Sequence, residues 1–204
     1  MWRHYVALGD SLTEGVGDYV DGIDRLGWVD QFYEMLRTHN PGLLYTNLGQ
    51  RDLMAHEVRY SQLEVALAIK PDLVSVIAGA NDIFKRQWHP ERYEHMMADM
   101  FEQLLASGAT VITATMPDLR YLPVAPGTRE KLLPKIMQLN EVVRRLAFRY
   151  DLALAETWYH PITLEKANWS KDGLHLNAFG YTGLARNVYE ALEAKTRNVL
   201  PLAG

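Results

Sequence analysis

Short apolar runs alternate along the chain with longer segments of helical periodicity, and this alternation limits the possible folds more than any other feature. The apolar runs predict strands at residues 5–8, 44–48, 73–78, 111–114 and 152–155. The segments between and after them predict helices at residues 28–37, 57–69, 90–107 and 130–150, with a final helix capped by Asn177. Continuous apolar strands separated by helices indicate a parallel sheet that is covered on both faces. The sequence therefore predicts an α/β fold with about five parallel strands.

The length of the chain favours one domain. Its 204 residues can form one full core but are few for two. We find no internal repeat, no low-complexity tract and no linker rich in Gly, Ser or Pro. We therefore expect residues 1–204 to form a single domain.

Composition excludes several classes of partner and site. A net charge of -4 offers no electrostatic reason for binding nucleic acid or an anionic membrane. No apolar run reaches the roughly 18 residues of a membrane span, and the first strand begins before any secretory signal would fit, so we expect a cytoplasmic protein. Cysteine is absent, which excludes disulfides, thiolate metal sites and a cysteine nucleophile.

Chemically suggestive side chains follow the predicted strands. Ser11 comes after the first strand, Asn81 after the third, and Asp172 and His175 lie in the segment before the last helix. The carboxyl ends of parallel strands lie at one edge of a sheet, which is where such folds form their sites. We therefore expect these four side chains to meet at that edge.

Together these residues make up a set for acyl transfer by serine. A serine hydroxyl needs a base within hydrogen-bond reach, and the base needs a partner that fixes its tautomer. His175 is the expected base for Ser11, and Asp172 is the expected partner of the other ring nitrogen. Gly173 between them permits the tight turn that this pairing requires.

The same chemistry needs donors for the oxyanion of the tetrahedral intermediate. Ser11 offers its backbone N–H, and Asn81 offers a side-chain amide. A third donor is expected from the loop that follows Leu48. The oxyanion would then be held from three different segments of the chain.

Four ordered blocks resemble those of the SGNH, or GDSL, hydrolases, and the resemblance spans nearly the whole chain. The blocks are Gly9-Asp10-Ser11-Leu12, Asn47-Leu48-Gly49, Gly79-Ala80-Asn81-Asp82 and Asp172-Gly173-Leu174-His175. The resemblance implies a three-layer αβα sandwich similar to flavodoxin and an SGNH-hydrolase-like domain. It also implies the activity of an esterase, lipase, thioesterase or carbohydrate acetylesterase.

By this resemblance Ser11 is the nucleophile, His175 the base, Asp172 the orienting acid and Asn81 an oxyanion donor. One position departs from the pattern, because Asp52 stands where the family usually has a second glycine. The group needed there is a backbone N–H, so we expect Asp52 to supply it. Aspartate adopts a positive φ at a higher cost than glycine, and either its carboxylate points away from the oxyanion or the oxyanion hole is weak.

These observations predict a serine hydrolase that cleaves carboxylic esters through an acyl-enzyme. The expected substrate is a small-molecule ester with a short-chain or water-soluble acyl group, such as an acetyl group. The predicted mechanism uses no cofactor and no metal ion. The oligomeric state does not follow from the sequence.

Two hypotheses from other classes remain alongside this one. The first is a non-catalytic flavodoxin-like module that binds a flavin or phosphate. It is disfavoured because Asp10 and Glu14 place carboxylates in the first loop. The second is a metal-dependent phosphoesterase with Asp10, Asp172 and His175 as ligands, but the sequence lacks a further cluster at ligand spacing and Ser11 would have no role.

Loops near the expected site contain Arg51 and several aromatic residues. We expect Arg51 to pair with Asp52 rather than to bind substrate. Most of the aromatic residues are interpreted as loop packing, with one or two lining an apolar pocket: Phe84, Trp88, Tyr121, Trp158, Tyr159 and Trp169. The loop at residues 117–128 is expected to form a stiff wall because it contains Pro123 and Pro126.

Overall fold

All five predicted strands form, and they lie side by side in one parallel sheet. The computed structural model describes residues 2–24 and 27–197. The strands are β1 (His4–Gly9), β2 (Leu44–Asn47), β3 (Leu73–Ile77), β4 (Thr110–Ala114) and β5 (Ala153–Ala155). Their order in the sheet is β2-β1-β3-β4-β5, and every neighbouring pair is parallel. The predicted α/β class with five parallel strands is confirmed.

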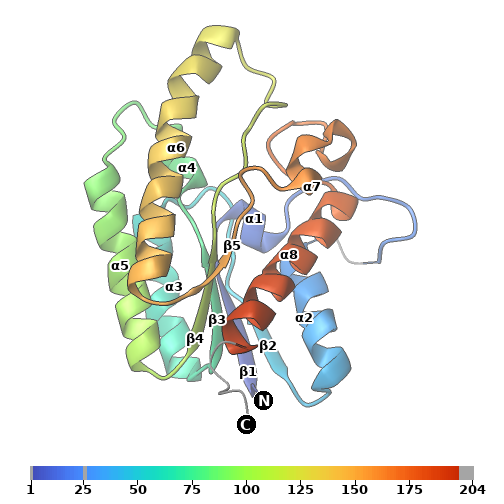
Figure 1. The fold of residues 1–204 in the computed structure, drawn as a ribbon, viewed down its shortest axis with the longest axis vertical. Helices are drawn as coiled ribbons and strands as arrows, with labels where there is room; N and C mark the ends of the chain where they lie inside the picture. Colours follow the sequence, from blue (N-terminus) through green and yellow to red (C-terminus); the bar gives the residue numbers. More distant parts are fainter. Residues whose placement is uncertain (1, 25–26, 198–204) are drawn as a thin grey trace.

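Helices cover both faces of the sheet and make the three-layer αβα sandwich (Figure 1). One face carries α2 (Trp28–His39) and α8 (Ala178–Arg197), which pack against each other. The other face carries α3 (Ala55–Ile69), α5 (Pro90–Ala106) and α6 (Pro126–Arg149). Four short elements lie in connecting segments: α1 (Ser11–Glu14), α4 (Ala80–Ile83), α7 (Pro161–Leu164) and the 3-10 helix at Lys166–Asn168.

The strand order explains why the helices divide between the faces. The connection from β1 to β2 runs one way along the sheet, and the connections from β2 to β3 to β4 to β5 run the other way. Because such crossovers are right-handed, opposite directions place their helices on opposite faces. The direction of winding reverses beside β1, so the carboxyl ends of β1 and β3 border the crevice where such folds bind ligands.

The sheet is held by a continuous apolar core. The interior strand β3 is buried along its whole length, as is β1 from Tyr5 onward, which accounts for their mainly apolar sequences; the one polar residue of β3, Ser75, bonds the Tyr5 hydroxyl at 2.7 Å. The inner face predicted for the last helix is buried, at Tyr181, Leu184, Val188 and Leu192. Asn177 caps this helix by accepting the Gly180 N–H at 2.9 Å, as predicted. The cap and the buried face fix where α8 begins, just after the segment that carries His175.

Two helices begin earlier than the sequence predicts. Helix α6 starts at Pro126, because proline is well suited to the first helical position, where its missing N–H is not needed. The wall expected at residues 117–128 therefore ends at residue 125. Helix α3 starts at Ala55, whose backbone N–H is accepted by the Asp82 carboxylate at 2.9 Å. That contact joins residues distant in sequence, but Glu57 also accepts the Met54 N–H at 2.8 Å, which is a local signal for this helix start.

Within residues 2–24 and 27–197, no helix combines the length and apolar character needed to cross a bilayer.

Candidate active site

A sharp turn after β1 presents Ser11 at the edge of the sheet. The turn needs glycine at position 9, since a Cβ there would lie 2.2 Å from both the Ile77 carbonyl oxygen and the Thr13 hydroxyl. Asp10 caps the short helix α1 by accepting the Leu12 N–H at 3.1 Å. Ser11 is the first residue of that helix and is partly exposed. The fold thus leaves its hydroxyl accessible from solvent.

The structure brings the two ends of the chain together at Ser11. The Ser11 hydroxyl lies 2.8 Å from Nε2 of His175. On the other side of the imidazole, Nδ1 lies 2.7 Å from Oδ2 of Asp172. The other carboxylate oxygen of Asp172 accepts the backbone N–H groups of Leu174 and His175 at 2.9 and 3.0 Å. Ser11, His175 and Asp172 therefore form one hydrogen-bonded chain, at the edge of the sheet where the topology predicted that they would meet.

A tight loop sets the position of His175 relative to Asp172. Gly173 has φ +63°, which glycine adopts at little cost. A Cβ at this position would also lie 2.1 Å from the Tyr121 carbonyl oxygen. The loop is closed by the Ser170 N–H, which donates to the His175 carbonyl at 2.8 Å. The role predicted for Gly173 in this turn is confirmed.

The loop also controls the charge of Asp172. Burial alone would raise its pKa, but the hydrogen bonds from the His175 ring and from two backbone N–H groups hold the pKa below the usual aspartate value. Asp172 therefore stays ionised at neutral pH and favours a proton on the facing nitrogen, Nδ1 of His175. That tautomer leaves Nε2 free to accept the proton of Ser11.

The groups proposed as oxyanion donors lie on three neighbouring segments. Asn81 follows β3 in the short helix α4, and its side-chain amide donates to the Leu53 carbonyl at 2.9 Å. This bond uses one of its two N–H groups and ties α4 to the segment after Asp52. Among the described residues, the backbone N–H groups of Ser11 and Asp52 have no acceptor. The roles of Asn81 and Asp52 toward a bound ester stay predictions.

Asp52 adopts the backbone conformation that its place in the pattern requires. Its φ is +68°, in the left-handed region that aspartate tolerates better than most residues. Its side chain is exposed. The missing second glycine is thus replaced by an aspartate in a glycine-like conformation.

Arg51 has a different partner from the one predicted. It pairs with Glu14 at the end of α1, with Nη2 to Oε1 at 2.5 Å, and not with Asp52. The prediction was wrong because it considered only the adjacent residue, whereas the turn after β2 brings Arg51 against α1. The only sequence signal was Glu14 itself, placed three residues after Ser11 in the first block.

Asp10 is buried beneath the turn that carries Ser11 and is not part of the hydrogen-bonded chain. Burial raises its pKa from 3.8 to about 7. One of its oxygens caps α1, and the other has no hydrogen-bond partner in the part of the chain that is described. Across these same residues, no three His, Asp or Glu side chains are grouped so that they would hold a metal ion. The ligand set of Asp10, Asp172 and His175 considered for a phosphoesterase does not assemble.

The raised pKa of Asp10 has a consequence for stability. Between pH 4 and 7 the folded protein keeps a proton that the unfolded chain has lost, so raising the pH through this range destabilises the fold. Asp10→Asn removes this titration. The free energy of unfolding of the variant minus that of wild type should be about 2–4 kcal/mol larger at pH 8 than at pH 5. Urea unfolding at the two pH values measures it, and an equal difference at both would contradict this assignment.

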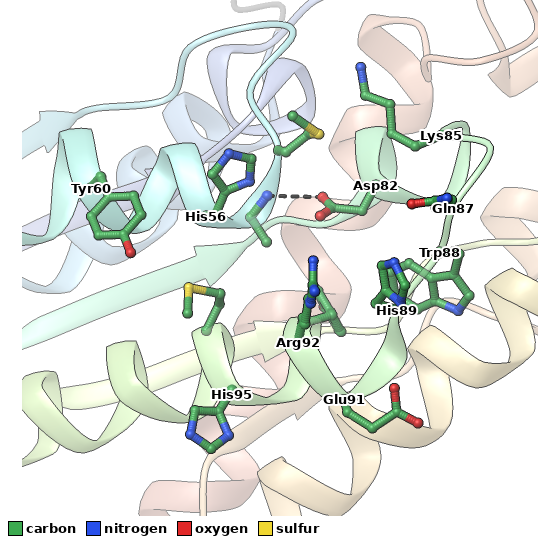
Figure 2. Close-up of a pocket in the computed structure, with 14 residues that line it drawn as sticks. His56, Tyr60, Asp82, Lys85, Gln87, Trp88, His89, Glu91, Arg92 and His95 are labelled. Atoms are coloured by element: carbon green, nitrogen blue, oxygen red, sulfur yellow. Dashed lines mark hydrogen bonds between the residues drawn. The ribbon is translucent and has the colours of Figure 1, made fainter.

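A cavity of about 620 Å³ opens beside α4, between the amino-terminal ends of α3 and α5 (Figure 2). Asp82 lies at its edge and accepts the Ala55 N–H there (Figure 2). The cavity is lined on several sides by apolar and aromatic groups, including Met54, Trp88 and Tyr93. Asn81 immediately precedes the lining residue Asp82, and Asp52 lies two residues before the lining residue Met54. The cavity therefore borders the two segments that carry these proposed oxyanion donors.

The aromatic residues divide much as interpreted from the sequence. Trp88 lines the cavity, while Trp158 and Trp169 are buried. Tyr121 packs against Trp169, with ring centroids 6.0 Å apart. Phe84 and Tyr159 are exposed at the surface, so the interpretation as loop packing does not hold for these two. One aromatic residue of this set therefore contributes to a pocket, and the others that are buried serve packing.

Comparisons with known proteins agree with this geometry. The model of the GDSL-like Lipase/Acylhydrolase family matches residues 7–182. No curated protein matches the chain. Among solved structures, TesA is 21% identical with a TM-score of 0.76, covering 94% of this chain and 99% of its own. Axe2, an acetylxylan esterase from Geobacillus stearothermophilus, is 19% identical with a TM-score of 0.75, covering 93% and 94%.

A third similar structure is LAE5, an alpha/beta hydrolase enzyme from the metagenome of Lake Arreo, Spain. It is 19% identical with a TM-score of 0.71, covering 98% of this chain and 97% of its own. At such identities these likenesses show a shared fold. They confirm the predicted three-layer architecture.

Proposed function

The chain belongs to the GDSL-like lipase/acylhydrolase family and is a carboxylic ester hydrolase, and from this premise we propose that it cleaves short-chain or water-soluble esters through an acyl-enzyme on Ser11. The hydrogen-bonded chain from Ser11 through His175 to Asp172 is the observation that carries the proposal. Family membership also separates the protein from the binding-module and phosphoesterase alternatives.

In the first half of the reaction Ser11 Oγ attacks the ester carbonyl carbon while Nε2 of His175 takes the hydroxyl proton. The 2.8 Å contact between the two atoms supports this transfer. Asp172 holds the imidazole from the opposite side and stabilises the imidazolium that forms. When the tetrahedral intermediate collapses, the alcohol leaves with the proton from His175, and the acyl group stays on Ser11.

The negative charge of the intermediate needs fixed donors. We assign this role to the backbone N–H groups of Ser11 and Asp52 and to the second amide N–H of Asn81. Among the described residues neither backbone N–H has another acceptor, and the amide spends only one N–H on Leu53. Donors fixed in advance stabilise the developing oxyanion without reorganising, which is typically the largest single contribution to such catalysis.

Water completes the cycle. His175 removes a proton from a water molecule that attacks the acyl carbonyl, and the oxyanion returns to the same donors. The proton then passes from His175 to Ser11 Oγ as the carboxylic acid is released. Hydrolysis therefore balances with one water consumed and no other reactant.

The preference for small esters rests on the size and chemistry of the neighbouring cavity. Its volume of about 620 Å³ suits a small-molecule substrate. Charged and polar side chains share its lining with the apolar ones, among them Lys85 and Arg92 (Figure 2). We propose that these charged groups disfavour a long hydrocarbon chain in the cavity.

A series of 4-nitrophenyl esters from acetate to palmitate tests this preference. We expect kcat/KM to be highest for chains of about two to four carbons and to fall about tenfold or more for chains of ten carbons or longer. The measurement is the initial rate of nitrophenolate release below the solubility limit of each ester. Fastest turnover of the long chains would contradict the substrate assignment and leave the serine mechanism in place.

A further inference from the structure

An ion pair between Glu14 and Arg51 joins two segments of the site. The guanidinium Nε donates to both carboxylate oxygens at 2.9 and 3.1 Å, and Nη2 donates to Oε1 at 2.5 Å. The backbone N–H of Arg51 adds a bond to Oε2 at 2.5 Å. Glu14 ends the helix that begins with Ser11, and Arg51 precedes Asp52. Four hydrogen bonds thus connect the nucleophile helix to the loop of a proposed oxyanion donor.

The rest of that loop is anchored close to the sheet. The Asn47 amide donates to the Thr13 carbonyl at 2.8 Å, and the Gln50 N–H donates to the Gly9 carbonyl at 3.2 Å. Gly49 packs so closely on α1 that a Cβ would lie 2.5 Å from the Glu14 nitrogen. Arg51 is the last anchor before Asp52, and no other residue ties the loop to α1 beyond this point within the described chain.

The Glu14–Arg51 ion pair also sets the net charge near His175, the proposed base. Two carboxylates lie near His175: Asp172 bonds its ring, and Glu14 lies one helical turn after Ser11, whose hydroxyl contacts the ring. The hydrogen bonds from Arg51 hold the pKa of Glu14 below its usual range, and the nearby His175 contributes in the same direction. Arg51 therefore neutralises a carboxylate that lies one helical turn from the serine bonded to this imidazole.

We propose that Glu14 and Arg51 are positioning residues for ester hydrolysis. Their ion pair holds the Asp52 N–H in a fixed position relative to α1, and it cancels the charge of Glu14 near His175. The positive φ of Asp52 makes such a restraint useful, because aspartate occupies that conformation at a cost that glycine does not bear. This inference rests on the proposed function.

Arg51→Ala tests both parts of the proposal. We expect kcat to fall about 10- to 100-fold with KM changed less than about threefold, since misplacing one oxyanion donor acts mainly on the transition state. We also expect the acid limb of the kcat/KM profile to move to higher pH by about 0.5 unit, because an unpaired Glu14 favours protonated His175. Arg51→Lys keeps the positive charge. It should return the acid limb of the kcat/KM profile to its wild-type pH while recovering only part of kcat.

Glu14→Gln reverses the sign of the electrostatic effect. It leaves Arg51 as an unpaired cation, so the acid limb should move to lower pH. The double variant Glu14→Gln/Arg51→Ala removes both charges, so its limb should return to the wild-type position while kcat stays low. Loss of a purely structural contact would not produce opposite shifts that cancel.

A matched surface pair provides the control. Arg145 makes two hydrogen bonds to Glu94 at 3.0 and 2.6 Å, with exposures of 48% and 30%, compared with 59% and 29% for Arg51 and Glu14. Arg145→Ala should leave kcat and the pH profile unchanged. The inference is overturned if Arg51→Ala and Arg51→Lys both have the kcat of wild type and the same acid limb in the kcat/KM profile. It is also overturned if Arg145→Ala loses as much activity as Arg51→Ala.

Failure of the proposed function gives a different result. Should Ser11→Ala hydrolyse esters as fast as the wild type, the serine mechanism itself is wrong. Should Ser11→Ala be inactive while both Arg51 variants behave like wild type, only the role of the ion pair is wrong. Melting temperatures of all variants identify any loss caused by unfolding, and the Arg51→Lys result then decides the inference if Arg51→Ala does not fold.

Discussion

Replacing Ser11 by alanine is expected to lower kcat/KM for a nitrophenyl ester by about four to six orders of magnitude. The Ser11 hydroxyl lies 2.8 Å from Nε2 of His175, and alanine removes this hydroxyl. Without it no acyl-enzyme can form. The residual rate would come from the remaining donors acting on water.

The structural cost of this change should be small. Ser11 is partly exposed, and its side chain makes the one contact to His175. We therefore expect the melting temperature to stay within a few degrees of wild type. Ser61→Ala is the matched control, because that exposed hydroxyl bonds only the Glu57 carbonyl on α3 and should leave the rate unchanged. A Ser11→Ala enzyme with more than about a hundredth of wild-type activity would contradict the nucleophile assignment.

Asp172→Asn is expected to have the second largest effect, lowering kcat by about 10²- to 10⁴-fold. The one side-chain oxygen that asparagine retains can still accept the two backbone N–H groups that now bond Asp172. The new NH₂ group then faces Nδ1 of His175, which must lose its proton and become an acceptor. The proton moves to Nε2, and that nitrogen can no longer take the proton of Ser11.

The measurement is kcat for the asparagine variant together with its thermal stability. Loss of the carboxylate removes an ionised group with a lowered pKa, so some stability above pH 4 is also lost. Asp99→Asn is the control, since Asp99 forms a comparable short ion pair with Arg59 at 2.5 Å away from the loop. Wild-type kcat in a folded Asp172→Asn enzyme would show that the carboxylate does not orient the imidazole.

Much of the fold follows from local sequence. The strand segments are apolar and short, and the long helices carry regular apolar faces, so the five strands and the five long helices could be predicted from their own residues. The convergence of Ser11 and His175 followed from topology, because both were placed at the carboxyl edge of one parallel sheet. The tight turn at Gly173 followed from the freedom of glycine.

Other features depend on contacts between distant segments and left no local trace. Arg51 meets Glu14 only because the turn after β2 packs on α1, so the sequence suggested the adjacent Asp52 instead. At the start of α3, one of the two capping contacts comes from Asp82 in another loop. The cavity beside α4 arises from how α3 and α5 approach each other, which no periodicity encodes.

The unpartnered oxygen of Asp10 is a further example. Asp10 caps α1 by accepting the Leu12 N–H. Its complete burial depends on the packing of the whole sheet edge, and so does the raised pKa that follows from burial. Its titration therefore could not be predicted from the local sequence.

The most direct test of the account is intact-protein and peptide mass spectrometry after treatment with a fluorophosphonate. The account predicts one adduct per chain, located on Ser11, with loss of activity in proportion to labelling. It also predicts no adduct in the Ser11→Ala variant and much slower labelling when His175 is replaced by alanine, since the hydroxyl then has no base. Stoichiometric labelling of another residue, or an unlabelled Ser11 in an enzyme that hydrolyses esters, would contradict it.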